Sequence, residues 1–464
     1  MFEKIKKIHF IGIGGSGMCG IAEVLINMGY NVCGSDMQES ENVRRLRKLG
    51  AVVNIGHRLE NLDDPHVVVV SSAIDRNNSE ITGALERKIP VIPRAEMLTE
   101  LMRLKYALCI AGTHGKTTTT SMTGLILYNA GMDPTVVIGG RFNNLETNAK
   151  LGGGDYIVAE ADESDGSFLH FTPAISIVTN IDDDHMDYYS NMDKLKNTFT
   201  EFLNKVPFYG FSVICGDDEN LRSILPLLNR PYRTYGLGEK CDYRASDISL
   251  GPERSVYKVI KEGREVGEIA VMCSGMHNVT NSLAACATAL EMGIDFKVIS
   301  DALLQYRGVG RRLEKMGEAG GVIFYDDYAH HPTEIALSMK SLKEIYPDSR
   351  LIAVFQPHRY TRTRNLSKKF PGSLSIADYI YITDIYPAGE IAIEGVSSMS
   401  IIDEFEDKSK VKYIPDICEL TDNVNSFLRP GDICVTLGAG DIYKILESLL
   451  KRRNVTAVKP DRDE

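Results

Sequence analysis

The sequence predicts an α/β protein made of three consecutive domains, each built on a parallel, doubly wound sheet. Short apolar segments of strand length alternate with amphipathic segments of helix length, which is typical of strand–helix–strand units. Several of the strand-like segments run directly into glycine-marked turns. The chain of 464 residues is also longer than one hydrophobic core usually supports. We therefore expect several sheets, with ligands bound beyond the carboxyl ends of their strands.

The predicted domains are residues 1–105, 106–309 and 310–450, followed by a frayed tail over residues 451–464. Each domain opens with an apolar segment that leads into a turn. The segments predicted to be strands are residues 8–13, 32–34, 67–70, 106–110, 156–159, 175–178, 212–215, 322–325, 351–355, 379–382 and 433–436. Helical patterns cover residues 17–28, 121–127 and 281–286, and another helix is predicted to begin at Pro332.

Composition argues against several classes of protein. The formal net charge of -11 at pH 7 argues against nucleic acid as the main partner. No apolar run approaches the ~20 residues that span a membrane, and the first apolar segment meets a glycine too soon for a signal peptide. The nine cysteines are scattered without a Cys-x-x-Cys pair, which is typical of reduced thiols. We expect a cytoplasmic protein that is not inserted in a membrane.

A glycine-rich turn follows the first predicted strand. Gly12-Ile13-Gly14-Gly15-Ser16-Gly17 satisfies the pattern G-x-G-x-x-G, and Asp36 ends the next predicted strand. This arrangement places a pyrophosphate at a helix N-terminus and a carboxylate near a ribose hydroxyl. The motif suits any diphosphate-linked nucleotide, so alone it is weak evidence for NAD. It predicts a Rossmann-like N-terminal domain, while Asp36 as a simple turn residue after Gly34 and Ser35 stays an alternative.

A second turn, the most informative stretch of the chain, follows the strand predicted at residues 106–110. Gly112-Thr113-His114-Gly115-Lys116-Thr117-Thr118-Thr119 leads from this strand into a helical pattern. Backbone N–H groups of such a loop cradle phosphate oxygens, the lysine neutralises charge, and the following threonine hydroxyl reaches Mg²⁺. The first glycine of the standard eight-residue phosphate loop would fall at Ile110, so a shorter G-T-x-G-K-T loop remains. It predicts a P-loop ATPase-like mononucleotide-binding central domain; a turn without a ligand is the alternative.

Acidic residues crowd two further strand ends. Residues 160–166 follow one strand, and residues 180–185 follow another. Carboxylates packed this closely are unfavourable without a cation, and Mg²⁺ takes one or two carboxylates together with phosphate oxygens and water. Glu160 is the predicted metal-binding residue, with a solvated acidic turn as the alternative. His185 is a candidate ligand for a second ion, although a lone histidine is as often structural.

Polar residues also mark the later strand ends. Asn278 and Asn281, at the start of a helix, are candidates for contacting an adenine edge, with a helix N-cap as the alternative. Arg311 and Arg312 open the third domain as candidate phosphate contacts. Three histidines and several arginines at adjacent strand ends predict a pocket for an anion and a carboxylate. They lie in residues 326–334 and 356–362.

Taken in chain order, these motifs resemble those of the Mur ligase family. The order is a diphosphate loop, a triphosphate loop, acidic and histidine metal positions, and a third domain rich in arginine and histidine. The resemblance extends from Ile11 to about Asp441. Its most specific parts are residues 112–119, 160–168, 275–281, 326–334 and 356–363. It implies a Rossmann-like C-terminal domain that completes an ATP-dependent ligase.

The resemblance also implies an activity and its ligands. Members of the family join an amino acid or peptide amine to a UDP-linked muramyl carboxylate, and this sequence is similar to the pattern that adds L-alanine to UDP-N-acetylmuramate. ATP and one or two Mg²⁺ ions are the implied cofactors. The implied partners are these small-molecule substrates, with no nucleic acid and no membrane insertion. A monomer or a homodimer is expected.

By resemblance, roles pass to individual residues according to the ligand that each is expected to contact. The UDP substrate would contact Gly14, Gly15, Ser16, Gly17, Asp36 and Ser164. ATP would contact Gly112, Thr113, His114, Gly115, Lys116, Thr117, Thr118, His277, Asn278, Asn281, Arg312 and Asp327. The metal positions would be Thr117, Glu160 and His185, and the amino-acid and carboxylate side would comprise Tyr328, His330, His358 and Arg359. The implied catalytic residues are Lys116, Glu160, His185, His330 and His331.

The implied mechanism passes through an acyl phosphate, because a carboxylate must gain a leaving group before an amine can displace it. His330, His331 or His358 is the candidate base for the incoming amine, and the sequence does not choose between them. Closure of the C-terminal domain is expected to exclude water from the acyl phosphate. Sister ligases support a second metal with a carbamylated lysine, which has no clear counterpart in this sequence. Ala329 stands where many relatives carry glycine.

Three alternatives remain on sequence alone. A nicotinamide oxidoreductase would account for Gly12–Gly17 but would leave Gly112–Thr119 and the acidic clusters unexplained. A non-catalytic UDP-sugar-binding protein would bind nucleotide without producing ADP. A ligase that recycles murein tripeptide is the nearest alternative enzyme. Such enzymes differ from this sequence around residues 162–166, where it follows the alanine-adding pattern.

Overall fold

The computed structural model describes residues 6–71, 73–144 and 147–456 of the chain, which forms two compact units. The first unit comprises Met1–Ser249, Val256–Met272 and Asn278–Val309; the second comprises Leu250–Ser255, Cys273–His277 and Gly310–Glu464. The first unit holds two of the three predicted sheets, and the second holds the other.

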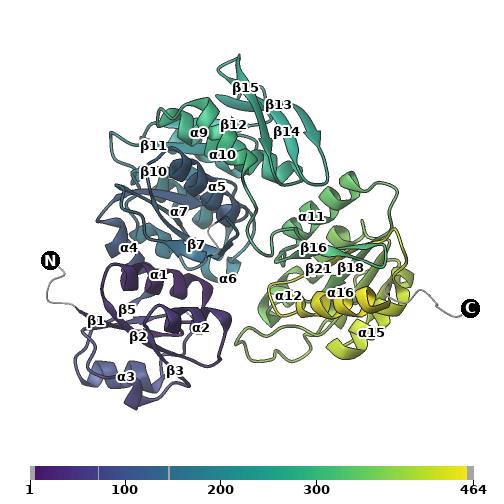
Figure 1. The fold of residues 1–464 in the computed structure, drawn as a ribbon, viewed down its shortest axis with the longest axis horizontal. Helices are drawn as coiled ribbons and strands as arrows, with labels where there is room; N and C mark the ends of the chain where they lie inside the picture. Colours follow the sequence, from purple (N-terminus) through teal and green to yellow (C-terminus); the bar gives the residue numbers. More distant parts are fainter. Residues whose placement is uncertain (1–5, 72, 145–146, 457–464) are drawn as a thin grey trace, which may run out of the picture. The chain divides into compact units, whose positions relative to one another are not determined.

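A five-stranded parallel sheet begins the first unit (Figure 1). In the order β3-β2-β1-β4-β5, its strands are β1 (Lys7–Ile11), β2 (Asn31–Asp36), β3 (Val52–Ile55), β4 (Val67–Val70) and β5 (Val91–Pro93). The helices that follow them are α1 (Ser16–Asn27), α2 (Glu41–Lys48), α3 (Ser79–Glu86) and α4 (Arg94–Met102). The chain moves from β1 outward to β3 and returns to β4 on the other side of β1. Ligands of open α/β sheets bind beside such a reversal, which is where the turn after β1 lies.

A ten-stranded sheet forms the rest of the first unit, in the order β15-β14-β13-β12-β11-β10-β6-β9-β7-β8. Its strands are β6 (Tyr106–Ala111), β7 (Thr135–Phe142), β8 (Thr147–Lys150), β9 (Tyr156–Glu160), β10 (Ile175–Val178), β11 (Phe211–Cys215), β12 (Tyr232–Gly236), β13 (Tyr243–Leu250), β14 (Ser255–Lys261) and β15 (Arg264–Val271). Its helices are α5 (Lys116–Asn129), α6 (Met186–Tyr189), α7 (Met192–Asn204), α8 (Glu219–Ile224), α9 (Met276–Glu291) and α10 (Phe296–Leu304). Strand β6 lies between β9 and β10 and is parallel to both. The carboxyl ends of these three strands therefore meet at one edge.

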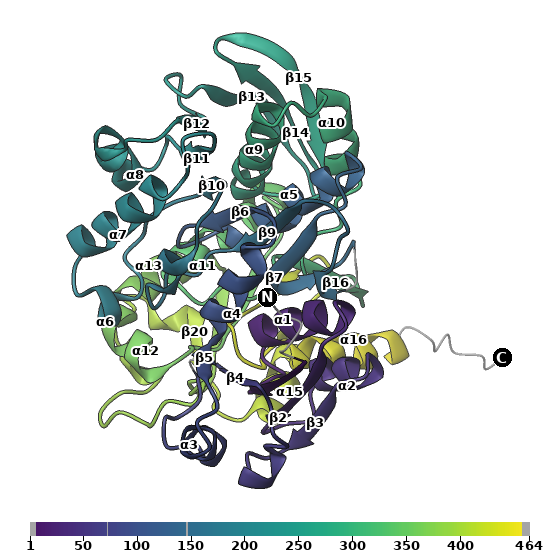
Figure 2. The same cartoon turned by 90° about the vertical axis from the view of Figure 1, so that its left-hand side faces the viewer.

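The central sheet is mixed, so the expectation of a wholly parallel sheet is wrong there. Strand β8 pairs antiparallel with β7, and β13, β14 and β15 extend the opposite edge (Figure 2). The two-residue turn Glu262–Gly263 between β14 and β15 has positive φ at both positions, as a type I′ hairpin requires. These three strands contain many half-exposed and charged residues, so no continuous apolar run marks them in the sequence.

A six-stranded sheet forms the core of the second unit, in the order β16-β17-β21-β18-β19-β20. Its strands are β16 (Glu314–Ala319), β17 (Val322–Asp327), β18 (Leu351–Phe355), β19 (Tyr379–Ile382), β20 (Val411–Tyr413) and β21 (Ile433–Leu437). Its helices are α11 (Pro332–Ile345), α12 (Tyr360–Leu366), α13 (Phe370–Leu374), α14 (Met399–Ile402), α15 (Ile417–Phe427) and α16 (Lys444–Thr456). Strand β16 is antiparallel to β17, and the other pairs are parallel. Buried apolar clusters on the two faces of the sheet give it a core on each side.

The strands predicted from apolar segments are confirmed to within two residues at each end, and α11 begins at Pro332 as predicted. The tail was predicted to fray from residue 451, but the structure differs there, because α16 continues to Thr456. Leu446 and Leu449 are buried on one face of α16, and Arg453 donates to Asn425 Oδ1 at 2.9 Å, so packing extends the helix past Lys451. Residues 457–464 lie outside the described part. Among the described helices, none combines the length and apolar character needed to cross a membrane.

Candidate functional site

The turn between β6 and α5 has the backbone of an anion-binding loop. Gly112 has φ +126°, and a Cβ there would overlap Thr179 Oγ1. Gly115, the N-cap of α5, has φ +84°. Thr179 Oγ1 donates to His114 O at 2.6 Å, and the Asn180 side chain accepts from His114 N at 2.8 Å. The N-cap of α5 is a glycine and so has no side chain that could cap the first turn, and a helix N-terminus of this kind is suited to an anionic ligand.

The ammonium of Lys116, the first residue of α5, lies inside this loop. Its Nζ donates to Gly112 O at 2.6 Å, to Thr113 O at 3.1 Å and to Glu163 Oε1 at 2.9 Å. Burial lowers the pKa of Lys116, but the carboxylates of Glu163 and Asp162 more than offset this, so the pKa is raised. Burial raises the pKa of Glu163. The loop therefore holds a fixed positive charge beside a buried carboxylate.

The three predicted metal positions follow the three strands that meet at this edge. Thr117 lies in the first turn of α5 after β6, Glu160 ends β9, and His185 follows β10. Glu160 Oε1 accepts from Gly139 N at 2.9 Å, and its charge contributes to raising the pKa of Lys116. The hydroxyl and the carboxylate fit Mg²⁺, which prefers oxygen ligands, and the imidazole fits it less well.

His185 lies in a strained turn rather than on a regular element. It has φ +58° and precedes α6. Its Nε2 lies 3.6 Å from Asp184 Oδ2 and 3.8 Å from Glu163 Oε1. Left-handed backbone at a residue other than glycine often accompanies function. Glu163 and Asp184 are the carboxylates beside this ring, and Glu163 was not among the residues predicted for the site.

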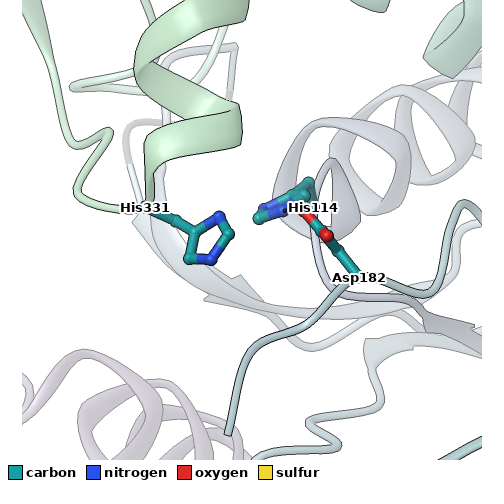
Figure 3. A group of neighbouring side chains, drawn as sticks. All are labelled: His114, Asp182 and His331. Atoms are coloured by element: carbon teal, nitrogen blue, oxygen red, sulfur yellow. Dashed lines mark hydrogen bonds and ion pairs between the residues drawn. The ribbon is translucent and has the colours of Figure 1, made fainter. Parts of the chain in front are cut away.

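His114 is paired with a carboxylate that was also not among the residues predicted for the site. His114 Nε2 lies 2.9 Å from Asp182 Oδ2, and Figure 3 draws the two side chains next to each other. Asp182 N donates to Thr113 Oγ1 at 2.9 Å. The pair therefore links the loop after β6 to the segment after β10. His331, which the same figure labels, belongs to the second unit.

The residues predicted to lie on the adenine side of ATP belong to different units. Asn278 and Asn281 belong to the first unit, and a Cβ at Gly115 would lie 2.6 Å from Asn281 Oδ1. Asn281 therefore packs against the loop itself. His277 belongs to the second unit, where its Nδ1 lies 3.5 Å from Ser341 Oγ on α11. Burial and then the positive charge of Arg312 lower the pKa of His277 to about 4, so it is neutral at pH 7.

The turn after β1 is organised around a carboxylate. Gly14 N donates to Asp36 Oδ2 at 2.8 Å, and Gln38 N donates to Asp36 Oδ1 at 3.1 Å. A Cβ at Gly14 would lie 2.9 Å from Asp36 Oδ2, so only glycine fits without a shift. Gly15 is the N-cap of α1, and the Ser16 side chain lies outside the described part. Asp36 therefore shapes the turn; a ribose contact stays a prediction.

Arg94 connects this turn to the acidic segment after β9. Its Nη2 lies 3.3 Å from Asp162 Oδ2, and a Cβ at Gly17 would lie 3.0 Å from its Nη1. Asp162 Oδ1 in turn accepts from Ser164 N at 3.0 Å. Gly17 and Ser164, both predicted for the UDP substrate, thus lie at the two ends of one chain of contacts. Arg94 begins α4, but no sequence motif singles it out.

A buried polar network lies within the N-terminal sheet. Glu80 on α3 is fully buried, and its Oε2 accepts from Ser35 Oγ at 2.7 Å and lies 2.8 Å from His9 Nε2. Its Oε1 accepts from Asn61 Nδ2 at 2.6 Å and from Arg58 N at 3.0 Å. Although burial alone raises it, these hydrogen bonds hold the pKa of Glu80 below its usual value. The carboxylate is saturated and serves the fold.

The acidic end of β17 in the second unit holds a carboxyl with a shifted pKa. Asp327 is buried; its Oδ1 accepts from Ala329 N at 3.0 Å, and Ser338 donates to its Oδ2. Burial raises the pKa of Asp327 to about 6. Arg311 donates to Asp326 Oδ2 at 2.8 Å and to two carbonyls of the turn after β21. Arg311 therefore fastens the end of the sheet, and a phosphate contact from Arg311 or Arg312 stays a prediction.

The histidines that follow differ in what their rings can do. His331 is the N-cap of α11, with Nδ1 accepting from Thr333 N at 3.3 Å. His330 Nδ1 lies 2.9 Å from Tyr328 O. A carbonyl only accepts, so Nδ1 carries the proton and Nε2 carries the lone pair. His330 and His358 rings lie 5.5 Å apart, and burial followed by the charge of neighbouring cations lowers the pKa of His358 to about 3.

Arginine side chains surround His358. Arg359 caps α12 with a strained φ of +69° and ψ of +140°, and Arg362 Nη1 lies 3.3 Å from His358 Nδ1. The His358 ring stacks on Tyr386 with centroids 5.8 Å apart. Imidazole and guanidinium groups that follow the carboxyl ends of β17 and β18 have a composition suited to a carboxylate beside an amine. Arg362 lies in the segment predicted for the anion and carboxylate pocket, although it was given no individual role, and Tyr386 was not a predicted site residue.

The glycine loops, the lysine and the sheet topology define an α/β protein of the nucleotide-binding class. Three family models match consecutive parts of the chain: the Mur ligase catalytic domain over residues 7–106, the Mur ligase middle domain over residues 110–289 and the Mur ligase glutamate ligase domain over residues 311–440. The chain belongs to the Mur ligase family, and its fold is the three-domain α/β fold predicted from the sequence.

Individual relatives extend along nearly the whole chain. UDP-N-acetylmuramate–L-alanine ligase of Endomicrobium trichonymphae is 50% identical over 451 residues, which cover 97% of this chain and 99% of that protein. The enzyme of the same name from Geobacter sulfurreducens is 48% identical and covers 97% and 98%. The crystal structure of the Thermotoga maritima UDP-N-acetylmuramate–alanine ligase is similar with a TM-score of 0.84 and 29% identity, covering 97% and 99%. A murein peptide ligase from Psychrobacter arcticus, 24% identical with a TM-score of 0.74, shares the fold.

Proposed function

We propose that this protein uses ATP to join L-alanine to the lactyl carboxylate of UDP-N-acetylmuramate, forming ADP, phosphate and an amide. The observation that carries the proposal is the position of the Lys116 ammonium, 2.6 Å from Gly112 O inside a loop whose helix begins at a glycine N-cap. Relatives of that activity align over 97% of the chain. Ligases that act on murein peptide are represented by a structure of lower identity, so the alanine-adding reaction is favoured.

We assign the UDP substrate to the domain of residues 1–105, ATP to residues 106–309, and the amino acid to residues 310–450. Thr117, Glu160 and His185 would hold Mg²⁺, which would supply charge neutralisation for the approach of two anions. The N–H groups at the start of α5 would cradle phosphate oxygens, and Lys116 would place one positive charge beside them. The N-terminus of α1, including the backbone N–H group of Gly17, would meet the UDP diphosphate.

The reaction is proposed to proceed in two steps. The substrate carboxylate attacks the γ-phosphorus of ATP, the bond to the β–γ bridging oxygen breaks, and an acyl phosphate and ADP result. The neutral amine of alanine then attacks the acyl carbon, and the tetrahedral intermediate collapses with loss of inorganic phosphate. Arg359 and Arg362 would hold the alanine carboxylate. Closure of the C-terminal domain would keep water from the acyl phosphate.

Of the three candidate bases, His330 is the one that the ring geometry favours. Its Nδ1 donates to Tyr328 O, which leaves Nε2 to accept a proton from the alanine ammonium. His331 Nδ1 is occupied as a helix cap, and the pKa of His358, lowered to about 3, makes it a weak base. Asp327, whose pKa is raised, and Arg312 are proposed to contact ATP, as the resemblance predicts.

The cellular setting is also a proposal. All nine cysteines of the chain are free thiols, which is consistent with a cytoplasmic location. We propose that the protein acts there on small molecules as a monomer or a homodimer.

The test is ADP release from Mg²⁺-ATP in a grid of acceptors and amines. The acceptor is UDP-N-acetylmuramate, present or omitted, and the amines are L-alanine, glycine, L-serine, D-glutamate and murein tripeptide. We expect release that needs UDP-N-acetylmuramate and L-alanine together, with a product heavier by one alanyl residue. Release with UDP-N-acetylmuramate and tripeptide but not with L-alanine would reassign the enzyme to recycling, and binding of UDP-N-acetylmuramate without release in any well would contradict the proposed ligase.

A further inference from the structure

The ammonium of Lys116 is already saturated within the protein. A lysine has three N–H donors, and here Gly112 O, Thr113 O and Glu163 Oε1 accept from them at 2.6, 3.1 and 2.9 Å. The second oxygen of Glu163 also lies 2.9 Å from Nζ. A phosphate oxygen can therefore bind this ammonium only if one of the three acceptors leaves.

Glu163 is the acceptor that can leave. The two carbonyls belong to the loop backbone, which is held at His114: Thr179 Oγ1 donates to His114 O, and Asn180 Oδ1 accepts from His114 N. The Glu163 carboxylate instead ends a side chain with rotatable bonds. It is also the acceptor most similar to phosphate, since both are anionic oxygens. Exchange of Glu163 for phosphate leaves the loop unchanged.

The surroundings of Glu163 suit a side chain that moves on a fixed backbone. Its carbonyl accepts from the Tyr189 hydroxyl and, at 3.0 Å, from Gly166 N, so the turn is anchored. The carboxylate is almost fully buried, and His185 Nε2 lies 3.8 Å from Oε1 as a second partner. The neighbouring carboxylates have other contacts: Glu160 accepts from Gly139 N, and Asp162 pairs with Arg94.

We propose that Glu163 is a positioning residue that acts through Lys116: it holds the ammonium in the loop when no nucleotide is bound, and it competes with phosphate for that ammonium. The proposal rests on the use of ATP at this loop but not on which acceptor or amine is joined. Its consequence is that Glu163 weakens nucleotide binding and speeds the departure of ADP.

The test is the affinity of ADP alone, measured by calorimetry in EDTA without either other substrate. Glu163→Gln keeps the shape of the side chain and removes its charge, and we expect ADP to bind roughly tenfold more tightly. ADP dissociation, followed by stopped flow, should slow by a similar factor. Glu163→Asp keeps the charge on a shorter side chain and should give a smaller gain. Circular dichroism of each variant reports whether it is folded.

Two controls separate competition from other roles. Asp165→Asn removes a charge from the same turn, where the exposed Asp165 side chain contacts Ser167 N; it should leave ADP affinity within about twofold of the parent. In a Lys116→Met background the gain from Glu163→Gln should disappear, because the proposed effect passes through the lysine.

Other outcomes overturn the proposal. Unchanged or weaker ADP binding by folded Glu163→Gln in EDTA would do so, as would a gain that persists without Lys116. Loss of affinity only when Mg²⁺ is added would instead assign Glu163 to the metal. Failure of the ligase reaction with ADP binding intact would contradict the proposed function and leave this inference standing, whereas no ADP binding by the parent protein would overturn the inference.

Discussion

The chain contains two glycine turns between a strand and a helix, and they differ in where charge is placed. In the turn after β1, the backbone N–H of Gly14 is held by the carboxylate of Asp36 at 2.8 Å. In the turn after β6, neutral groups of Thr179 and Asn180 hold the backbone, and the charge belongs to Lys116. One turn is shaped by an anion, and the other carries a cation.

This difference matches the chemistry proposed for each turn. A diphosphate that is only bound can be met by N–H dipoles at a helix N-terminus. A phosphoryl group in transfer carries charge that a fixed cation stabilises far better in a buried site. A second carboxylate, that of Glu80, lies within the same sheet and is saturated by four hydrogen bonds. The two turns should therefore respond differently to substitution.

The largest difference is expected for Lys116→Met. Loss of the ammonium should lower ADP release by about a thousandfold or more, because charge on the transferring phosphoryl group is no longer neutralised. Binding of UDP-N-acetylmuramate should stay within about twofold of the parent, because the first turn has no part in this charge. Steady-state kinetics and calorimetry measure the two quantities. Equal losses in both would show that the turns do not act separately.

Removal of divalent metal should also separate the turns. With excess EDTA we expect ADP release to fall below about one hundredth of the Mg²⁺ value, since Glu160 and Thr117 then have no cation to bind. Binding of UDP-N-acetylmuramate should change little, because the turn after β1 is held by the Asp36 carboxylate, which accepts from Gly14 N, and not by a metal ion. Activity that survives EDTA would contradict the assignment of these positions to a metal. Recovery on adding back Mg²⁺ is the control.

Alanine at the two glycines compares the turns by stability. Gly112→Ala combines a φ of +126° with an overlap on Thr179 Oγ1, so we expect a loss of about 3 kcal/mol in the free energy of unfolding. Gly14→Ala brings a Cβ within 2.9 Å of Asp36 Oδ2 and Val43 Cγ2, and about 1 to 2 kcal/mol should be lost. Urea unfolding measures both. The opposite ranking would show that the first turn is the more constrained.

Asp36→Asn tests the role of the carboxylate charge that organises the turn after β1. The amide can still accept from Gly14 N but no longer carries charge, so we expect the KM for UDP-N-acetylmuramate to rise about tenfold. The KM for ATP should be unchanged. Gln38→Ala is the matched control, because the Gln38 contact to Asp36 uses its backbone N–H. A rise in both KM values would show that the substitution disturbs the whole unit.

An effect that depends on pH is expected for Glu80→Gln. The pKa of Glu80 in the folded protein lies below its ordinary value of 4.5. The ionised carboxylate therefore stabilises the fold above pH 4.5, and this stability is lost as pH falls through the lower folded pKa. We expect about 1 to 2 kcal/mol less stability for the variant at pH 7 and a shallower decline in acid. Urea titrations at pH 7 and pH 3.5 check this, and parallel declines would contradict it.

Sequence patterns located the two turns because strand, glycine and helix are adjacent along the chain. Gly112, Lys116 and Gly14 could be named in advance, and their backbone conformations or contacts fit the expected loops. Groups that support them were missed when they come from distant segments. Arg94 meets Asp162 across 68 positions, and Glu163 meets Lys116 across 47. Such pairs follow from sheet order, which local periodicity does not encode.

The same limit explains the missed strands and the roles of histidines. Strands β13 to β15 carry charged, half-exposed residues instead of an apolar run, so they had no apolar signal. His330, His331 and His358 were equal candidates in the sequence. They differ in the structure only through what each ring nitrogen contacts, as Tyr328 O and Thr333 N show. Ring contacts of this kind depend on folded geometry.

The division into two units has a consequence for gene fragments. The chain enters and leaves the second unit repeatedly, because Leu250–Ser255 and Cys273–His277 belong to it as well as Gly310–Glu464. A fragment that begins at Gly310 would lack His277, whose ring contacts Ser341 on α11. The complementary fragment, residues 1–309, would still contain these two short segments but would lack the rest of the unit to which they belong. Expression as two separate halves should therefore yield aggregation-prone proteins, and a boundary that follows the two units crosses the chain five times instead of once.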